Sequence, residues 1–153
     1  MALSVFISYS TRDLENATAL RSWVESAGAQ PFLAAYAVAP GQPLALDIMA
    51  AIKGCDLFLL LWSQNARSSE WVPQEIGIAR GAGKSIMPVV LQPEIELPGF
   101  IKDLKYLEVY KDPTAAVQWL YHDVAARVKQ KDTDALVAVG VVGAVLLLLA
   151  SSK

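Results

Sequence analysis

The fold is decided by a run of six apolar residues, Leu57-Phe58-Leu59-Leu60-Leu61-Trp62. A half-buried strand would alternate apolar and polar side chains, whereas an unbroken apolar run is typical of a parallel sheet covered on both faces. Four further segments are interpreted as strands, at residues 5–8, 30–33, 86–91 and 106–110. Pro88 lies inside the fourth strand along the chain and favours an edge strand or a bulge there, because proline cannot donate a ladder hydrogen bond.

Helical patterns separate these strands. A helix is expected over 12–27, where apolar side chains recur at helical spacing from Leu14 to Ala27, and Gly28 follows as a stop signal. Further helices are expected at 44–55, 70–81 and 113–129, with a polar loop over 63–69. Strands that alternate with helices predict right-handed βαβ units. We therefore expect an α/β fold of the flavodoxin-like type, a five-stranded parallel sheet with helices on both faces, plus a C-terminal hydrophobic helix.

Composition excludes several classes of function. The 153 residues suffice for one domain of ordinary size. The single cysteine, Cys55, excludes an internal disulfide, and the single histidine, His122, excludes a multi-histidine metal site, so no metal is expected. The net charge of −2 gives no support to nucleic-acid binding.

The C-terminal segment differs from the rest of the chain. Residues 135–150 are sixteen uncharged residues, which as a helix would reach about 24 Å against a bilayer core of about 30 Å. We expect a domain over 1–129, a charged linker over 130–134 and a transmembrane helix over 135–150. A buried C-terminal helix is the alternative, although the segment is apolar on every face. Lys129 and Lys131 suit a cytoplasmic flank, so the predicted location is the cell membrane, single-pass, with the domain in the cytoplasm.

Polar and aromatic residues gather where strands are expected to end. Open parallel sheets bind ligands beyond the carboxyl ends of their strands. Trp71 and Glu75, four residues apart, can share one helix face next to that edge. Glu75 as a solvated helix residue and Trp71 as a core anchor are the alternative interpretations. The other candidates end the first and third strands: Ser8, Tyr9, Ser10, Trp62 and Ser63.

Three motifs in order resemble the TIR (Toll/interleukin-1 receptor) domain in its bacterial form, over about Leu3 to Lys129. The first is Phe6-Ile7-Ser8-Tyr9-Ser10 with Arg12-Asp13, and the second is Ala39-Pro40-Gly41, which is similar to the family's BB loop. The third is the apolar strand with Ser63, followed by Trp71-x-x-x-Glu75.

The resemblance implies an enzyme, an NAD⁺ glycohydrolase or ADP-ribosyl cyclase. Such TIR domains cleave the nicotinamide–ribose bond of NAD⁺ and give nicotinamide with ADP-ribose or a cyclic ADP-ribose isomer. NAD⁺ is then the substrate, and no separate cofactor is expected. The resemblance also implies a role in bacterial antiphage defence and an active homo-oligomer formed through TIR–TIR contacts. By motif, Glu75 is the catalytic residue, and the nucleotide lies near Tyr9, Ser10, Trp62, Ser63 and Trp71.

One departure from the family pattern keeps a second function open. NAD⁺-cleaving members often carry an acid at the end of the second strand, whereas Phe32-Leu33-Ala34-Ala35 has none. The alternative is a non-catalytic, membrane-anchored TIR module that recruits other TIR proteins. A receiver-like sensor ranks last, because the first strand lacks the acidic cluster of a phospho-acceptor site.

Overall fold

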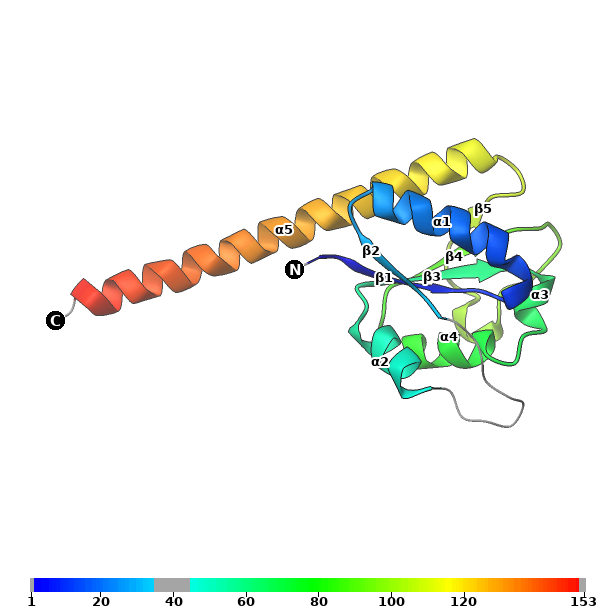
Figure 1. Cartoon of the computed structure of the whole chain (residues 1–153), viewed down its shortest axis with the longest axis horizontal. Helices are drawn as coiled ribbons and strands as arrows, with labels where there is room; N and C mark the ends of the chain where they lie inside the picture. The colour runs from blue at the N-terminus through cyan, green and yellow to red at the C-terminus, as the bar shows by residue number, and fades with distance from the viewer. Residues whose placement is uncertain (1, 35–44, 152–153) are drawn as a thin grey trace.

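The sheet has five parallel strands in the order β2-β1-β3-β4-β5 (Figure 1). The computed structural model describes residues 2–34 and 45–151. The predicted α/β architecture is confirmed, with β3 at the centre of the sheet and all six of its residues buried. The strands are β1 (Ser4–Ser8), β2 (Gln30–Leu33), β3 (Leu57–Trp62), β4 (Ile86–Val90) and β5 (Leu107–Glu108).

Helices cover both faces of the sheet (Figure 1). Helices α1 and α5 contact each other on one face, and α2 and α4 contact each other on the opposite face. The helices are α1 (Leu14–Ser26), α2 (Leu46–Gly54), α3 (Gln64–Arg67), α4 (Val72–Gly81) and α5 (Pro113–Ser151), with 3-10 turns η1 (Thr11–Asp13) and η2 (Gly99–Ile101).

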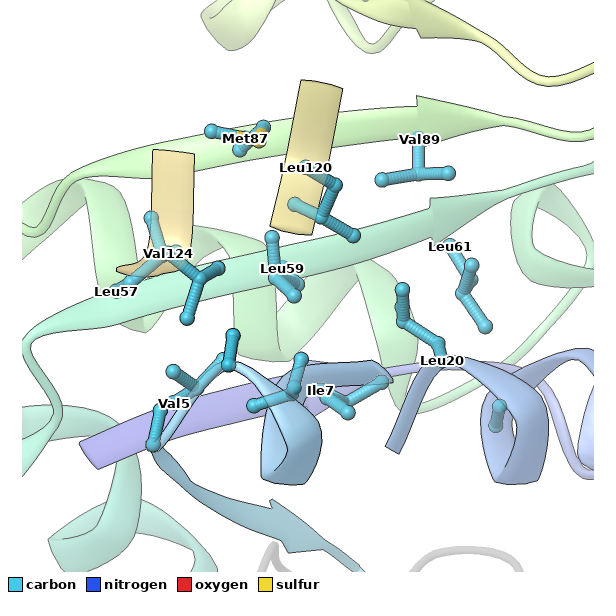
Figure 2. Close-up of a cluster of buried hydrophobic side chains, with 14 of the residues drawn as sticks. Val5, Ile7, Leu20, Leu57, Leu59, Leu61, Met87, Val89, Leu120 and Val124 are labelled. Carbon is cyan, nitrogen blue, oxygen red and sulfur yellow. The ribbon is translucent and has the colours of Figure 1, made fainter. Parts of the chain in front are cut away.

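Two apolar clusters form the core, one under each helix layer. The period-2 geometry of β3 sends Leu57, Leu59 and Leu61 into the cluster beneath α1 and α5. Figure 2 shows these side chains meeting Leu20 of α1 and Leu120 of α5. The alternate residues of β3 enter the other cluster, beneath α2 and α4. Each fully buried side chain of this size contributes about 1.5–3 kcal/mol through the hydrophobic effect.

The interpretation of β4 as an edge strand is wrong, because β4 pairs with both β3 and β5. Leu91 N donates to Trp62 O, so the odd-numbered residues of β4 direct their backbone groups toward β3. Pro88 therefore directs its missing N–H toward β5. Pairing with β5 involves only Val89 and Val90, so no ladder bond is lost at the proline.

Other local differences follow from short-range geometry. The segment 63–69, expected to be a loop, contains the short helix α3. Leu14, expected on the core face of α1, is 53% exposed. The 3-10 turn η1 directly precedes α1 and sets the direction in which the chain enters the helix at Leu14. The expected motif Ala39-Pro40-Gly41 lies outside the described residues.

Helix α5 is one uninterrupted helix from the domain to the C-terminal segment. The expected linker over 130–134 is helical and does not break it. The domain boundaries 1–129 and 135–150 stay a prediction, since a continuous helix marks no boundary of its own. Among the described residues, this is the one helix long and apolar enough to cross a membrane, and none of its apolar window is buried. Leu136, Leu147 and Leu148 are each at least 70% exposed.

Candidate functional site

The parallel arrangement brings residues from distant parts of the chain to the carboxyl edge of the sheet. Ser8 ends β1, and Ser63 follows β3, where its hydroxyl accepts the Ala66 amide at 3.0 Å and caps α3. Helix α4 begins at Val72, directly after its N-cap residue Trp71. Three separate segments therefore supply the polar and aromatic groups of this edge.

Glu75 is a carboxylate held inside the protein. Its exposed fraction is 0%, and it lies on the buried face of α4 beside Ile76. Ser8, also fully buried, donates its hydroxyl to Glu75 Oε1 at 2.6 Å. The bond joins residues 67 positions apart in the chain and links the end of β1 to α4. Because an ionisable group is costly to bury, a carboxylate enclosed at the ligand-binding edge of a parallel sheet is a candidate functional group.

Tyr9 lies next to this carboxylate. Its hydroxyl donates to Ala34 O at 2.8 Å, at the end of β2. Burial, and then the negative charge of Glu75, raise the pKa of the Tyr9 phenol. The phenol therefore stays protonated at neutral pH and remains a hydrogen-bond donor. The Ala34 carbonyl thereby fixes the Tyr9 side chain at the end of β2.

A pocket of about 450 Å³ opens at the same edge, between the β1–α1 connection and the start of α4. Trp71, which is half-buried, and Ser10 both line it. Ser69 accepts the amides of Trp71 and Val72 at 3.2 and 3.3 Å, so it orders the entry to α4 although it is not the N-cap residue. The remaining lining residues are mostly polar: Thr11, Arg12, Gln64, Asn65, Ser68, Ser69 and Glu70.

Trp62 and Ser63 have other surroundings. The Trp62 indole is 2% exposed, donates to Glu96 O at 2.9 Å and borders a different pocket, of about 340 Å³. Ser63 donates its hydroxyl to Asp13 Oδ2 at 2.5 Å. Neither residue is among those that line the pocket beside Trp71, so the structure does not bring them to it.

Asp13 is a buried residue of this edge that sequence reasoning did not single out as part of the site. Besides Ser63, it accepts Asn65 Nδ2 at 2.9 Å, and its exposed fraction is 7%. Asp13 thereby joins the β1–α1 connection to the β3–α3 connection, the two loops that flank the pocket. Only the contact between loops 50 residues apart reveals its buried role.

No metal centre is formed by the described residues, which contain no group of three His, Cys, Asp or Glu side chains placed to hold an ion. The polar groups of the edge are instead hydroxyls, amides, single carboxylates and the Arg12 guanidinium. Such groups suit hydrogen bonding to a polar organic ligand.

A family model described as "TIR domain" matches residues 5–121. The chain belongs to the TIR domain family. No curated protein matches this TIR chain. Among solved structures, the TIR domain of the Toll-related receptor TRR-2 from Hydra magnipapillata has a TM-score of 0.64 at 25% identity, covering 78% of this chain and 96% of that one.

Two further solved structures are similar to this TIR chain. A metazoan TIR-STING receptor from C. gigas has a TM-score of 0.56 at 25% identity, covering 74% of this chain and 39% of the receptor. The CMP N-glycosidase BcmB of Clostridium botulinum has a TM-score of 0.54 at 22% identity, covering 76% of this chain and 96% of the enzyme. At that identity the likeness to BcmB shows a shared fold.

Proposed function

We propose that this TIR protein cleaves NAD⁺ at the nicotinamide–ribose bond, giving nicotinamide with ADP-ribose or a cyclic ADP-ribose isomer. The observation that carries the proposal is the buried Glu75 carboxylate, bonded to Ser8 at the carboxyl edge of a TIR sheet. A neighbour of the same fold is named a CMP N-glycosidase, so the fold is compatible with cleavage of an N-glycosidic bond of a nucleotide.

The proposed chemistry requires little of the protein beyond one placed negative charge. Nicotinamide leaves as a neutral molecule with the electrons of the C–N bond, and positive charge develops on the ribose, as in glycoside hydrolysis generally. Glu75 stabilises that charge electrostatically from its buried position beside the pocket. Water then adds to the ribose and releases a proton, or a nitrogen of the adenine closes the ring to give the cyclic isomer.

The other residues of the edge bind and orient the nucleotide in this proposal. Trp71 supplies a flat apolar wall for a ring or for the developing cation. Ser10 offers a hydroxyl in the same pocket. The raised pKa of Tyr9 keeps its phenol protonated, and the phenol O–H donates to Ala34 O and holds the end of β2 beside the site. Trp62 and Ser63 act indirectly, because their polar atoms are committed to backbone and side-chain partners outside the pocket.

The proposal includes a membrane anchor and an assembly. The exposed apolar end of α5 would be covered by lipid, with the TIR domain on the cytoplasmic side. Anchored copies share a high local concentration, which favours TIR–TIR contacts. One solved structure of the same fold is that of the TIR domains in the activated Roq1 resistosome. A role in antiphage defence belongs to the same proposal.

A second function is favoured by the enclosure of Glu75. The described lining of the pocket includes Trp71 and not Glu75, and the carboxylate has no exposed surface. A TIR module that only recruits other TIR proteins to a membrane would retain Glu75 as a buried partner of Ser8. Such a module would release no nicotinamide at any concentration.

The test is incubation of the full chain, in vesicles at high surface density, with NAD⁺ and chromatographic separation of the products. Nicotinamide is expected from the wild type and not from Glu75→Ala. Glu15→Ala is the matched control, because Glu15 is an exposed carboxylate in the first turn of α1, near the same edge. Release no higher than background from both wild type and Glu75→Ala would support the recruitment module instead, and equal release above background would rule out Glu75 as the catalytic residue.

A further inference from the structure

We infer that the amino edge of the sheet rests against the phospholipid headgroup layer, so that the candidate site at the carboxyl edge faces away from the membrane. The inference rests on the proposed membrane anchor and adds to it an interaction surface and an orientation. The amino edge is the end of the sheet at which the parallel strands begin, and it includes Ser4, Asp56 and Lys53.

The direction of α5 carries the first step. Helix α5 runs opposite to the strands and continues past the start of β1, beyond the amino edge (Figure 1). The apolar segment at 135–150 therefore leaves the domain on the side opposite Ser8 and Glu75. Since all five strands are parallel, the site and the exit of the helix lie at opposite edges.

A polar clamp fixes α5 to the amino edge just before the apolar segment. Lys131 Nζ donates to Asp56 Oδ2 at 2.6 Å and to Ala2 O at 3.1 Å. Asp56 Oδ2 also accepts the Ser4 amide at 2.8 Å, so the clamp includes the start of β1. Burial raises the pKa of Asp56, but the Lys131 and Ser4 hydrogen bonds and the charges of Lys131 and Lys84 outweigh it and lower the pKa. Asp56 is thus ionised at neutral pH.

The distance along the helix places this clamp at headgroup depth. Lys131 is four residues before Ala135, which is about 6 Å at the rise of an α-helix. The headgroup region adds roughly 5–8 Å on each side of the hydrocarbon core. When residues 135–150 span the core, Asp56 and Ala2 therefore lie among the headgroups.

The lysines of the amino edge can contact phosphate groups, and Asp132 and Asp134, both exposed, carry the opposite charge on the same stretch of α5. Lys53 in the last turn of α2 and Lys129 on α5 are exposed, and Lys84 lies in the turn that leads into β4. None of these three lysines belongs to an ion pair formed within the described part of the chain. Lysines close to a membrane are attracted to anionic lipids.

The experiment measures the depth of each edge in vesicles of phosphatidylcholine with phosphatidylserine. Cys55, which is 3% exposed, is first replaced by alanine in the full chain. Single cysteines, each carrying an environment-sensitive dye, are then placed at the amino edge (Ser26→Cys, Lys53→Cys) or at the carboxyl edge (Glu15→Cys, Glu70→Cys). All four positions are exposed. A lipid with a spin label on its headgroup is the quencher.

The amino-edge dyes are expected to lose most of their fluorescence, and the carboxyl-edge dyes to keep it. Equal quenching at both edges, or stronger quenching at Glu15 and Glu70, would overturn the orientation. Insertion of a long Gly/Ser linker between Asp134 and Ala135 is the matched control, since it keeps the anchor and should abolish the difference between edges. Flotation of the same vesicles tests the anchor separately, and a chain that does not float overturns both inferences. Nicotinamide release reports on the enzyme activity independently of either result.

Discussion

Removal of the Ser8 hydroxyl tests how strongly the buried carboxylate depends on its partner. In Ser8→Ala, Glu75 Oε1 loses a donor at 2.6 Å between two side chains with no exposed surface. Hydrogen bonds to charged groups contribute about 1.5–3 kcal/mol, so we expect the free energy of unfolding to fall by that amount. Because the lost oxygen leaves little cavity volume, the lost hydrogen bond accounts for most of the expected fall in the free energy of unfolding.

The assay is urea unfolding of the full chain in a mild detergent, followed by tryptophan fluorescence. Ser22→Ala is the control, because Ser22 is an exposed serine whose hydroxyl donates only to a backbone carbonyl of its own helix. Its effect is expected within about 0.5 kcal/mol of zero. In a Glu75→Gln background the Ser8→Ala loss should shrink, since the neutral amide needs the donor less. A Ser8→Ala loss no larger than that of Ser22→Ala would refute the reasoning.

Three other perturbations have distinct expected outcomes. Leu59→Ala, in the centre of β3, should lower the free energy of unfolding by about 2–5 kcal/mol, whereas Leu14→Ala at an exposed position should change it by well under about 1 kcal/mol. Asp56 has a pKa lowered by folding, so its stabilisation is present at neutral pH and is lost as pH falls through the folded pKa. Wild type and Asp56→Asn should differ at neutral pH and converge in acid, as measured by urea unfolding across pH, and a constant difference would contradict the Lys131 clamp. Asp13→Ala leaves two donors without their acceptor and should cost about 1–3 kcal/mol for each, while Asp13→Asn, which keeps one acceptor oxygen, should cost less in the same assay.

The architecture could be predicted because its signals are local. The apolar run of β3 is buried throughout, and the alternation of strands with helices determines a parallel sheet. The edge-strand interpretation from Pro88 was wrong, because the sequence does not show which neighbouring strand the missing N–H faces. In the structure it faces β5, which pairs with β4 only at Val89 and Val90. The continuity of α5 was also missed, since charged residues at 130–134 are compatible with both a linker and a helix.

The sequence predicted which residues lie at the carboxyl edge of the sheet, but it did not predict which of them contact one another. The rule for parallel sheets placed Ser8, Ser10 and Trp71 at the carboxyl edge, where the structure has them. The Ser8–Glu75 bond and the contact of Asp13 with Asn65 join residues more than 50 positions apart, which no local pattern encodes. For the same reason the sequence did not show that the Trp62 indole turns toward Glu96.

The central claim is tested most directly by the rate of nicotinamide release from NAD⁺ by full-length Glu75→Gln in vesicles, compared with wild type and Glu15→Gln. Glutamine keeps an oxygen that can accept the Ser8 hydrogen bond and removes only the charge. We predict a loss of at least about a hundredfold for Glu75→Gln, the size expected when a preorganised electrostatic group is removed, and an unchanged rate for Glu15→Gln. A Glu75→Gln rate equal to that of the wild type would contradict the account.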